Sequence, residues 1–236
     1  MHLLSFVLIF VFVGQMTEGR ELTFCHTEMP PYSVGGVDGV SGIKVDILQD
    51  VVVHIEGVTA KTVLMPWLRC LAAVQDGDVD GVLPLFRNVE REDFLVFTDP
   101  VFEQHIRFWY RREAFPDSFE WSGDFNELAH LRLGLLNGGY LSAEMEAAFA
   151  GRDVVHANKL DSLMLMLARG RIDLFATDTE IGRSLSVRHG VEDQVAAIER
   201  PIISQPTQFG LSRASGASTL QADFNEAIRA WQAGQK

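Results

Sequence analysis

The segment Pro66–Pro100 reads PWLRCLAAVQDGDVDGVLPLFRNVEREDFLVFTDP and decides the fold of this chain. Its first part carries apolar residues at helical spacing up to Gly77, and the apolar run after Asp80 is typical of a strand buried on both faces. A glycine after the last helical turn suits a left-handed C-cap. An arginine-bearing loop, 87–93, and an aromatic strand follow. This order predicts a helix, a buried strand and a loop that together form one wall of a cleft.

A later segment repeats this pattern. Leu163–Ala176 reads LMLMLARGRIDLFA, so an apolar helix again stops at a glycine, Gly170, and Gly-x-Ile-Asp again leads into an apolar run. A short apolar run between helices is typical of a parallel sheet covered on both faces. The two copies predict an α/β protein of two lobes, each a mixed sheet flanked by helices.

Apolar spacing elsewhere completes the two lobes. Val45, Leu48, Val52 and Ile55 predict a helix, Leu131–Leu136 a buried strand, Leu220, Phe224, Ile228 and Trp231 a terminal amphipathic helix, and Val101–Arg111 and Ile202–Leu211 two extended crossings between lobes. Two crossings form a hinge that a ligand can close. We therefore expect lobe one at 20–104 plus 205–236, lobe two at 112–201, and the hinge at 105–111 and 202–204.

The N-terminus carries a short apolar run, Leu3–Val13, interrupted only by Ser5. A transmembrane helix needs about 20 apolar residues, so this run is too short to span a membrane, and a lasting membrane anchor is the weaker alternative. Together with the small residues Thr17 and Gly19 that follow, it is typical of a secretory signal peptide. We expect residues 1–19 to be removed and a soluble protein to be exported.

Charge and cysteine content narrow the class of protein. The formal net charge is −12, and no cluster of lysine or arginine of the kind that neutralises phosphates is present, so nucleic acid is not an expected partner. The chain has two cysteines, Cys25 and Cys70. In an oxidising compartment they could form a disulfide, or they could be two buried small apolar residues. The sequence leaves both alternatives open.

Several short motifs, in their order and spacing, resemble those of the bacterial extracellular solute-binding proteins of family 3, the two-lobed receptors of polar amino acid ABC transporters. They are Pro30-Pro31-Tyr32, Gly42 with Val45-Asp46-Ile47, Trp67-Leu68-Arg69, Glu90-Arg91 ahead of Phe97-Thr98-Asp99-Pro100, Gly138-Gly139-Tyr140, and the run from Gly170 to Asp178. The resemblance covers nearly all of the chain after residue 19. It implies the type II periplasmic binding protein fold and a periplasmic monomer without cofactor or metal. Its function would be to capture a small ligand, an amino acid or a related carboxylate, and to deliver it to an ABC transporter permease.

The resemblance implies roles for an arginine and an aspartate. Arg91 matches the family arginine that holds the ligand's α-carboxylate, and its planar fork offers two parallel hydrogen bonds. The alternative is a solvated arginine in the charged string Glu90-Arg91-Glu92-Asp93. Asp178 matches the carboxylate that receives the α-ammonium, at a strand end where open α/β sheets place ligands. Its alternative role is to cap a helix that starts near Thr179.

Aromatic rings and a glycine turn complete the implied site. Tyr32 and Trp67 match the positions at which the family places rings around the ligand side chain, and they could instead be ordinary core aromatics. Gly139 and Tyr140 precede a predicted helix. Their backbone N–H groups could meet a carboxylate, or they could form a plain strand-to-helix turn.

Further residues near the implied site leave the identity of the ligand open. Asn88 lies in the loop just before the arginine, where many amino acid receptors carry hydroxyl groups, and we include it among the ligand-binding candidates. Arg69 and Arg87 favour an acidic or polar ligand side chain. Glu28 and the net acidity of the chain favour a basic one.

Two other functions fit the same fold. Periplasmic cyclohexadienyl dehydratases resemble these receptors and use cleft carboxylates as acid or base, for which Glu28 or Asp178 would serve. No Gly-x-Ser-x-Gly, His-Glu-x-x-His, P-loop or dinucleotide motif is present, so we do not expect an enzyme. A signalling receptor would present its closed form to a membrane sensor, and nothing in the sequence separates that role from transport.

Overall fold

The computed structural model describes residues 19–115, 119–137 and 143–235. In chain order the elements are β1 (Arg20–His26), β2 (Val34–Gly36), β3 (Gly39–Ser41), α1 (Ile43–Val52), β4 (Val58–Leu64), α2 (Trp67–Asp76), β5 (Gly81–Phe86), α3 (Val89–Glu92), β6 (Leu95–Phe97), β7 (Phe102–Arg111), η1 (Arg112–Ala114), η2 (Phe125–Leu128), β8 (Leu133–Leu136), α4 (Ala143–Phe149), β9 (Val154–Ala157), α5 (Leu160–Ala168), β10 (Leu174–Asp178), α6 (Thr179–Arg188), β11 (Val195–Ala197), β12 (Ile203–Ser212), η3 (Ala217–Leu220) and α7 (Gln221–Gly234). The predicted signal segment 1–19 lies, apart from Gly19, outside the described residues. Within the described ranges, no helix combines the length and the apolar character that a membrane span requires.

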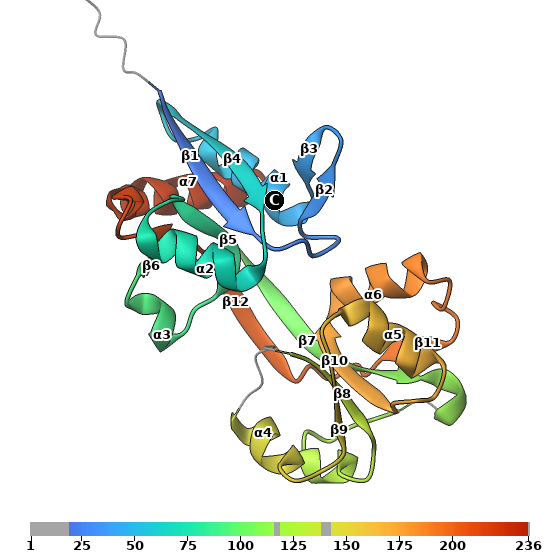
Figure 1. Ribbon diagram of the computed structural model, residues 1–236. Coiled ribbons are helices and arrows are strands. Elements are labelled where there is room, and N and C mark those ends of the chain that lie inside the picture. Colours follow the sequence, from blue (N-terminus) through green and yellow to red (C-terminus); the bar gives the residue numbers. More distant parts are fainter. Residues whose placement is uncertain (1–18, 116–118, 138–142, 236) are drawn as a thin grey trace, which may run out of the picture.

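A ten-stranded sheet runs through the molecule in the order β4-β1-β5-β12-β7-β10-β8-β9, with β6 beside β12 and β11 beside β7. The strands β4, β1 and β5 are parallel to one another, as are β10, β8 and β9. The pairs β5–β12, β12–β7 and β7–β10 are antiparallel. Figure 1 shows two lobes with β7 and β12 running between them. The predicted α/β fold, two lobes each built on a mixed sheet, is confirmed.

The two crossing strands run side by side. They pair from Phe102 opposite Thr207 to Ile106 opposite Ile203. Beyond this stretch β12 continues into lobe one, where it pairs with β5 and β6, and β7 continues into lobe two, where it pairs with β10 and β11. The two extended segments expected from the sequence are therefore strands. The lobe boundaries and the hinge motion remain predictions.

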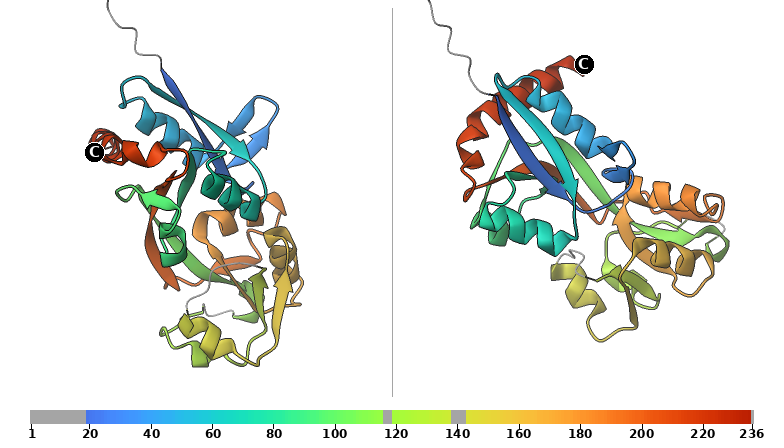
Figure 2. Two further views of the ribbon diagram at one scale, coloured as in Figure 1. Left: turned by 60° about the vertical axis from the view of Figure 1, so that its left-hand side comes forward. Right: turned by 45° about the horizontal axis from the view of Figure 1, so that its top comes forward.

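Lobe one has a core on each face of its sheet because alternate residues of a strand point to opposite sides. Leu22 and Phe24 of β1 pack against α1 and α7, in a cluster with Leu48 and Phe224. Cys25, between them in alternation, packs with α2 on the other face. Figure 2 shows α1 and α7 on one side of the strands and α2 on the opposite side. The predicted helices around Leu48 and Phe224 are thus confirmed.

Lobe two follows the same plan. Phe175 of β10 packs toward α5 and α6, in a cluster with Leu163 and Leu185. Its neighbour Leu174 packs on the other face with Phe125 of η2 and with residues of α4. Each lobe is therefore a sheet layer between two apolar cores.

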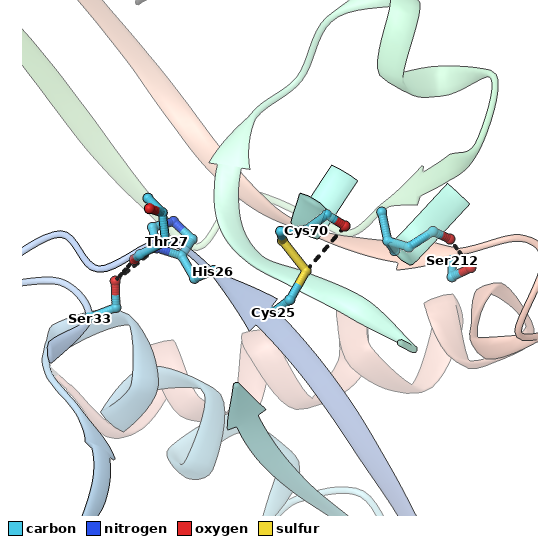
Figure 3. Close-up of a disulfide and its surroundings, with 7 residues drawn as sticks. Cys25, His26, Thr27, Ser33, Cys70 and Ser212 are labelled. Carbon is cyan, nitrogen blue, oxygen red and sulfur yellow. Dashed lines mark hydrogen bonds between the residues drawn. A yellow bond between two sulfur atoms is a disulfide. The ribbon is translucent and has the colours of Figure 1, made fainter. Parts of the chain in front are cut away.

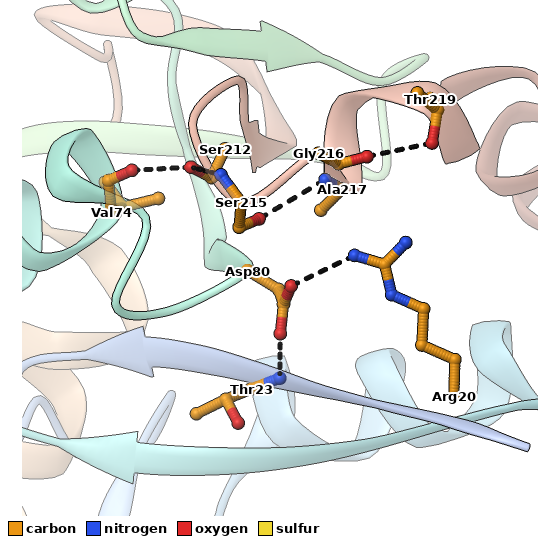
Figure 4. A network of polar contacts seen from close by, with 9 residues as sticks. All are labelled: Arg20, Thr23, Val74, Asp80, Ser212, Ser215, Gly216, Ala217 and Thr219. Carbon is orange, nitrogen blue, oxygen red and sulfur yellow. Dashed lines mark hydrogen bonds and ion pairs between the residues drawn. The ribbon is translucent and has the colours of Figure 1, made fainter.

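Both copies of the repeated sequence pattern form the predicted helix, turn and strand. Gly77 ends α2 with φ of 84°, a left-handed conformation that glycine adopts without strain. Asp80, just before β5, accepts a hydrogen bond from the backbone N–H of Thr23 in β1 at 2.9 Å and pairs with Arg20, as Figure 4 shows. The aspartate of the pattern thus fastens the turn to the neighbouring parallel strand.

The second copy uses its aspartate in the same way. Asp173, just before β10, accepts hydrogen bonds from the backbone N–H of Arg132 at 2.9 Å and from the guanidinium of the same residue. Arg132 immediately precedes β8, which is parallel to β10. In both lobes, therefore, the aspartate of the repeat has a structural role: its carboxylate binds the backbone at or next to the neighbouring parallel strand.

Cys25 of β1 and Cys70 of α2 form a disulfide with their Cα atoms 5.6 Å apart (Figure 3). Both residues are fully buried, so the structure settles the alternative that the sequence left open. The bond ties α2 to the central sheet. Since α2 begins at Trp67, the disulfide also fixes the helix that carries this ring into the cleft described next.

Candidate functional site

A cleft of about 730 Å³, a size typical of small-molecule sites, lies between the lobes. Lobe one contributes His26, Thr27, Glu28, Met29, Pro30, Lys44, Trp67, Leu85, Phe86 and Arg91, and β7 contributes Gln104 and Ile106. Lobe two contributes residues 135–137, 158–161 and 176–178 together with Ile181, Leu185 and Arg188.

Arg91 forms part of the lobe-one wall. It lies in the short helix α3, is half-buried, and places its guanidinium 5.4 Å from the centre of the Trp67 ring. Its Nη1 donates to the carbonyl of Phe86 at 2.7 Å, and burial lowers the pKa of Arg91 from its ordinary value. The remaining guanidinium N–H groups meet no hydrogen-bond or ion-pair partner among the described residues. They are therefore free to bind an anion in the cleft.

The neighbours of Arg91 position it rather than line the cleft. Asn88 caps α3, because its Oδ1 accepts a hydrogen bond from the backbone N–H of Arg91 at 2.9 Å. Arg87 pairs with Glu92 at 2.7 Å on the exposed surface. The alternative of a surface arginine in a charged string thus describes Arg87, while Arg91 faces the cleft. Arg69 is exposed on α2 and does not line the cleft.

Asp178 closes the lobe-two side at the end of β10 and is only 3% exposed. Its Oδ1 accepts hydrogen bonds from the backbone N–H groups of Glu180 at 2.9 Å and Ile181 at 3.2 Å, so it caps α6. The same oxygen accepts a hydrogen bond from the Tyr32 hydroxyl at 2.7 Å. Asp178 therefore has the capping role considered from the sequence and also lines the cleft.

Tyr32 links the lobes instead of facing the ligand space. Its ring stacks on Phe102 with centroids 5.9 Å apart and belongs to the apolar cluster of lobe two with Ile181 and Leu185. Burial and the charge of Asp178 raise the pKa of the Tyr32 phenol, so the hydroxyl stays protonated and donates. The structure does not bring this ring to the cleft surface, whereas Trp67 does line it.

Lys44 is the cleft residue that the sequence reasoning missed. It lies in the first turn of α1, is 3% exposed, and holds its Nζ 4.9 Å from the centre of the Tyr32 ring. Burial lowers the pKa of Lys44 to about 7, an effect that the charge of Asp178 opposes. A signal was present, because Lys44 precedes Leu48 by four positions and so lies on the apolar face of the helix.

A glycine turn sets the positions of Tyr32 and Lys44. Gly42 has φ of 118°, and a Cβ there would lie 2.6 Å from the carbonyl oxygen of Pro31. Only glycine fits so close to the backbone in that conformation. The backbone N–H groups of Ile43 and Lys44 donate to the carbonyls of Pro31 and Tyr32 at 3.1 and 3.0 Å. The first turn of α1 is thereby fixed on the Tyr32 loop.

His26 is buried beside this turn and is neutral. Its Nδ1 lies 2.8 Å from the Ser33 hydroxyl and 2.9 Å from the Thr27 carbonyl (Figure 3). Burial, and then the charge of Lys44, lower the pKa of His26 to about 3. The ring therefore adds no charge to the cleft near neutral pH.

The lobe-two wall carries several polar side chains among apolar ones. Asn137 donates through Nδ2 to Oδ1 of Asn158 at 2.7 Å, and both line the cleft. Asp161 lies between Arg188 at 3.2 Å and His189 at 2.9 Å. These side chains offer amide groups and a compensated ion pair to a bound solute.

The remaining predicted site residues fall in two groups. Glu28 is exposed and lines the cleft. Gly139 and Tyr140 lie outside the described residues. Across the described part of the chain, no group of three or more His, Cys, Asp or Glu residues is placed to hold a metal ion. The charged side chains of the described walls are Glu28, Lys44 and Arg91 from lobe one and Lys159, Asp161, Asp178 and Arg188 from lobe two, an arrangement suited to noncovalent binding of a small charged molecule.

Comparison with known proteins gives a family and a fold. The model of the bacterial extracellular solute-binding proteins, family 3, matches residues 22–235. No curated protein sequence matches the chain. A histidine kinase sensor domain with similarity to periplasmic binding proteins is 20% identical, covers 92% of this chain and 93% of its own, and superposes with a TM-score of 0.76.

Two amino acid-binding structures are also similar. The GluR0 ligand-binding core in complex with L-glutamate is 19% identical over 92% of this chain and 94% of its own, with a TM-score of 0.74. Holo ArgBP from T. maritima is 19% identical over 90% of each chain, with a TM-score of 0.67. At these identities the likenesses show a shared fold.

Proposed function

This chain belongs to the bacterial extracellular solute-binding proteins of family 3, and we propose that its interlobe cleft captures a small polar solute, an amino acid or a related carboxylate. The cleft has the volume for such a molecule and charged side chains on both walls. The similar structures that bind glutamate and arginine support a ligand of this class.

The observation that carries this proposal is the state of Arg91. Its guanidinium lies against Trp67 and uses one donor for a backbone carbonyl, its other donors meet no partner among the described residues, and the side chain lines the cleft. The charge of Glu90 acts on Arg91, but no described carboxylate forms an ion pair or hydrogen bond with its guanidinium, so burying it halfway is costly unless an anion binds it. The ligand's carboxylate supplies that anion, with two parallel hydrogen bonds.

The other residues have complementary roles in this proposal. Trp67 packs against the ligand, and Asp178 accepts the ligand's ammonium on the oxygen that is not used to cap α6. Closure of the lobes around β7 and β12 then produces the form that a partner recognises. Binding alone is sufficient for this role, and we propose no catalysed reaction.

Delivery to an ABC transporter permease is the function that we propose for the closed form. Its site of action would be the periplasm, after removal of residues 1–19. A second candidate is ligand sensing for a membrane partner, which the likeness to a histidine kinase sensor domain favours. Uptake of the labelled ligand by cells with and without the gene separates the two, since sensing alone leaves uptake unchanged.

Isothermal titration calorimetry tests the binding proposal. The protein, refolded to remove carried-over ligand, is titrated with the twenty amino acids, alongside Arg91→Ala and the matched control Arg87→Ala. We expect Arg91→Ala to weaken binding roughly 100-fold, because a buried charge pair loses one partner, and Arg87→Ala to bind normally. Equal binding by Arg91→Ala and the unchanged protein would contradict the proposal.

A further inference from the structure

Lys44 is a buried cleft residue whose ammonium has no hydrogen-bond acceptor among the described residues. It lies on the apolar face of α1 with 3% of its surface exposed, and it lines the cleft. Its Nζ contacts the face of the Tyr32 ring but makes no hydrogen bond or ion pair with any described residue. A buried ammonium with its three donors unused is costly, so a group that accepts those donors stabilises it.

The nearest carboxylate does not meet this need. Asp178 interacts electrostatically with Lys44, yet its Oδ1 already accepts three hydrogen bonds, two from the N-terminus of α6 and one from Tyr32. The positive end of α6 also stabilises the charge of Asp178. Asp178 is therefore held by its own lobe and by Tyr32, and it leaves the donors of Lys44 free.

The charge balance of the inner cleft is positive. Four cationic side chains line the cleft, Lys44, Arg91, Lys159 and Arg188, against three carboxylates, Glu28, Asp161 and Asp178, while His26 is neutral. Of these carboxylates only Asp178 is buried, and Asp161 is paired with Arg188. A zwitterionic amino acid would leave this excess cation uncompensated. A ligand with one additional negative charge would neutralise it.

We propose, on the basis of the function given above, that Lys44 binds a second anionic group of the ligand, so that the cleft selects acidic amino acids over zwitterionic and basic ones. Arg91 holds the α-carboxylate, Asp178 the ammonium, and Lys44 the side-chain carboxylate. The lysine thereby decides which member of the ligand class is bound.

The test compares ligands that have the same shape and differ in charge. Calorimetry with L-glutamate against L-glutamine, and with L-aspartate against L-asparagine, measures the preference of the protein for a carboxylate over an amide. We expect at least one acidic member to bind roughly tenfold or more tightly than its amide, the ratio typical of a charge-assisted hydrogen bond. Lys44→Met, which keeps the length of the aliphatic stem and removes the ammonium, is expected to abolish the preference.

Controls separate this proposal from the proposed function. Lys61→Met removes a lysine that is exposed on β4 and does not line the cleft, and it should keep the preference. A melting curve of Lys44→Met checks that it folds. If Lys44→Met fails to fold, Lys44→Arg takes its place: it keeps the charge but changes the position of the donors, and it should keep only part of the preference.

Each outcome decides one of the two proposals. The proposed role of Lys44 is wrong, while amino acid binding stands, if each amide binds as tightly as the corresponding acid or if L-arginine binds as tightly as L-glutamate and L-aspartate. The same holds if Lys44→Met keeps the preference. If no amino acid binds but succinate does, and Lys44→Met loses it, the anionic group at Lys44 is supported on a ligand that lacks an amine. If Arg91→Ala binds as well as the unchanged protein, the proposed function itself fails.

Discussion

Replacing Tyr32 with phenylalanine removes the hydrogen bond that joins the two lobes, together with the interaction of the hydroxyl with the Gln104 side chain. The hydroxyl donates to the Asp178 carboxylate at 2.7 Å across 146 positions of sequence. Phenylalanine keeps the stacking on Phe102 and the contact of the ring with Lys44. A buried hydrogen bond to a charged group contributes about 1.5–3 kcal/mol, so we expect the free energy of unfolding of Tyr32→Phe to fall by that amount.

Denaturant unfolding of the ligand-free protein, followed by tryptophan fluorescence, measures this change. Tyr110→Phe is the matched control, because Tyr110 is also buried and its hydroxyl makes no hydrogen bond to a described residue; we expect a change below about 0.5 kcal/mol for it. Small-angle X-ray scattering should show a larger radius of gyration for Tyr32→Phe if the bond also holds the lobes together. An unchanged free energy of unfolding together with an unchanged radius would refute the argument that this bond links the lobes.

Three further changes probe the frame of the cleft. Reduction of the Cys25–Cys70 disulfide, which spans 45 positions, should lower the free energy of unfolding by about 4 kcal/mol, measured by denaturation with and without a reductant; an equal midpoint in both would contradict it. Gly42→Ala should destabilise the protein more than Gly39→Ala in thermal melts, because both glycines have φ near 117° but only the Cβ at Gly42 would strike backbone atoms. The pKa of Lys44 is about 7 in the folded protein and 10.5 ordinarily, so between these pH values the unfolded chain binds one proton more than the folded protein. The free energy of unfolding should therefore rise with pH across that window, by at most about 1.4 kcal/mol per pH unit. Lys44→Met should remove this rise.

Local sequence patterns were sufficient to predict most of the fold. The glycines at Gly77 and Gly170 mark helix ends because a left-handed residue is required there, and the apolar runs after them are strands because both faces are covered. The disulfide was left undecided, since spacing along the chain does not give the distance between Cys25 and Cys70.

The site was predictable only in part, because its decisive contacts join distant parts of the chain. Arg91 and Trp67 lie on neighbouring elements of one lobe, and both line the cleft. The hydrogen bond between Tyr32 and Asp178 joins different lobes, so no local pattern could indicate that the ring packs against lobe two instead of the ligand. Lys44 was not predicted because the apolar residues of its helix indicate a packed face, and a single lysine within that pattern does not show that its ammonium reaches a cleft.

The pairing of β7 with β12 limits how the lobes can move. A ribbon of two hydrogen-bonded strands bends readily out of its plane, but shearing or in-plane bending would disrupt the ladder between 102–106 and 203–207. We therefore expect a hinge motion in which the lobes rotate about one axis and twist little relative to each other. Binding of a solute would then change mainly one quantity, the angle between the two lobes. A partner that touches both lobes could then read occupancy from the spacing of two rigid surfaces, without any contact with the solute itself.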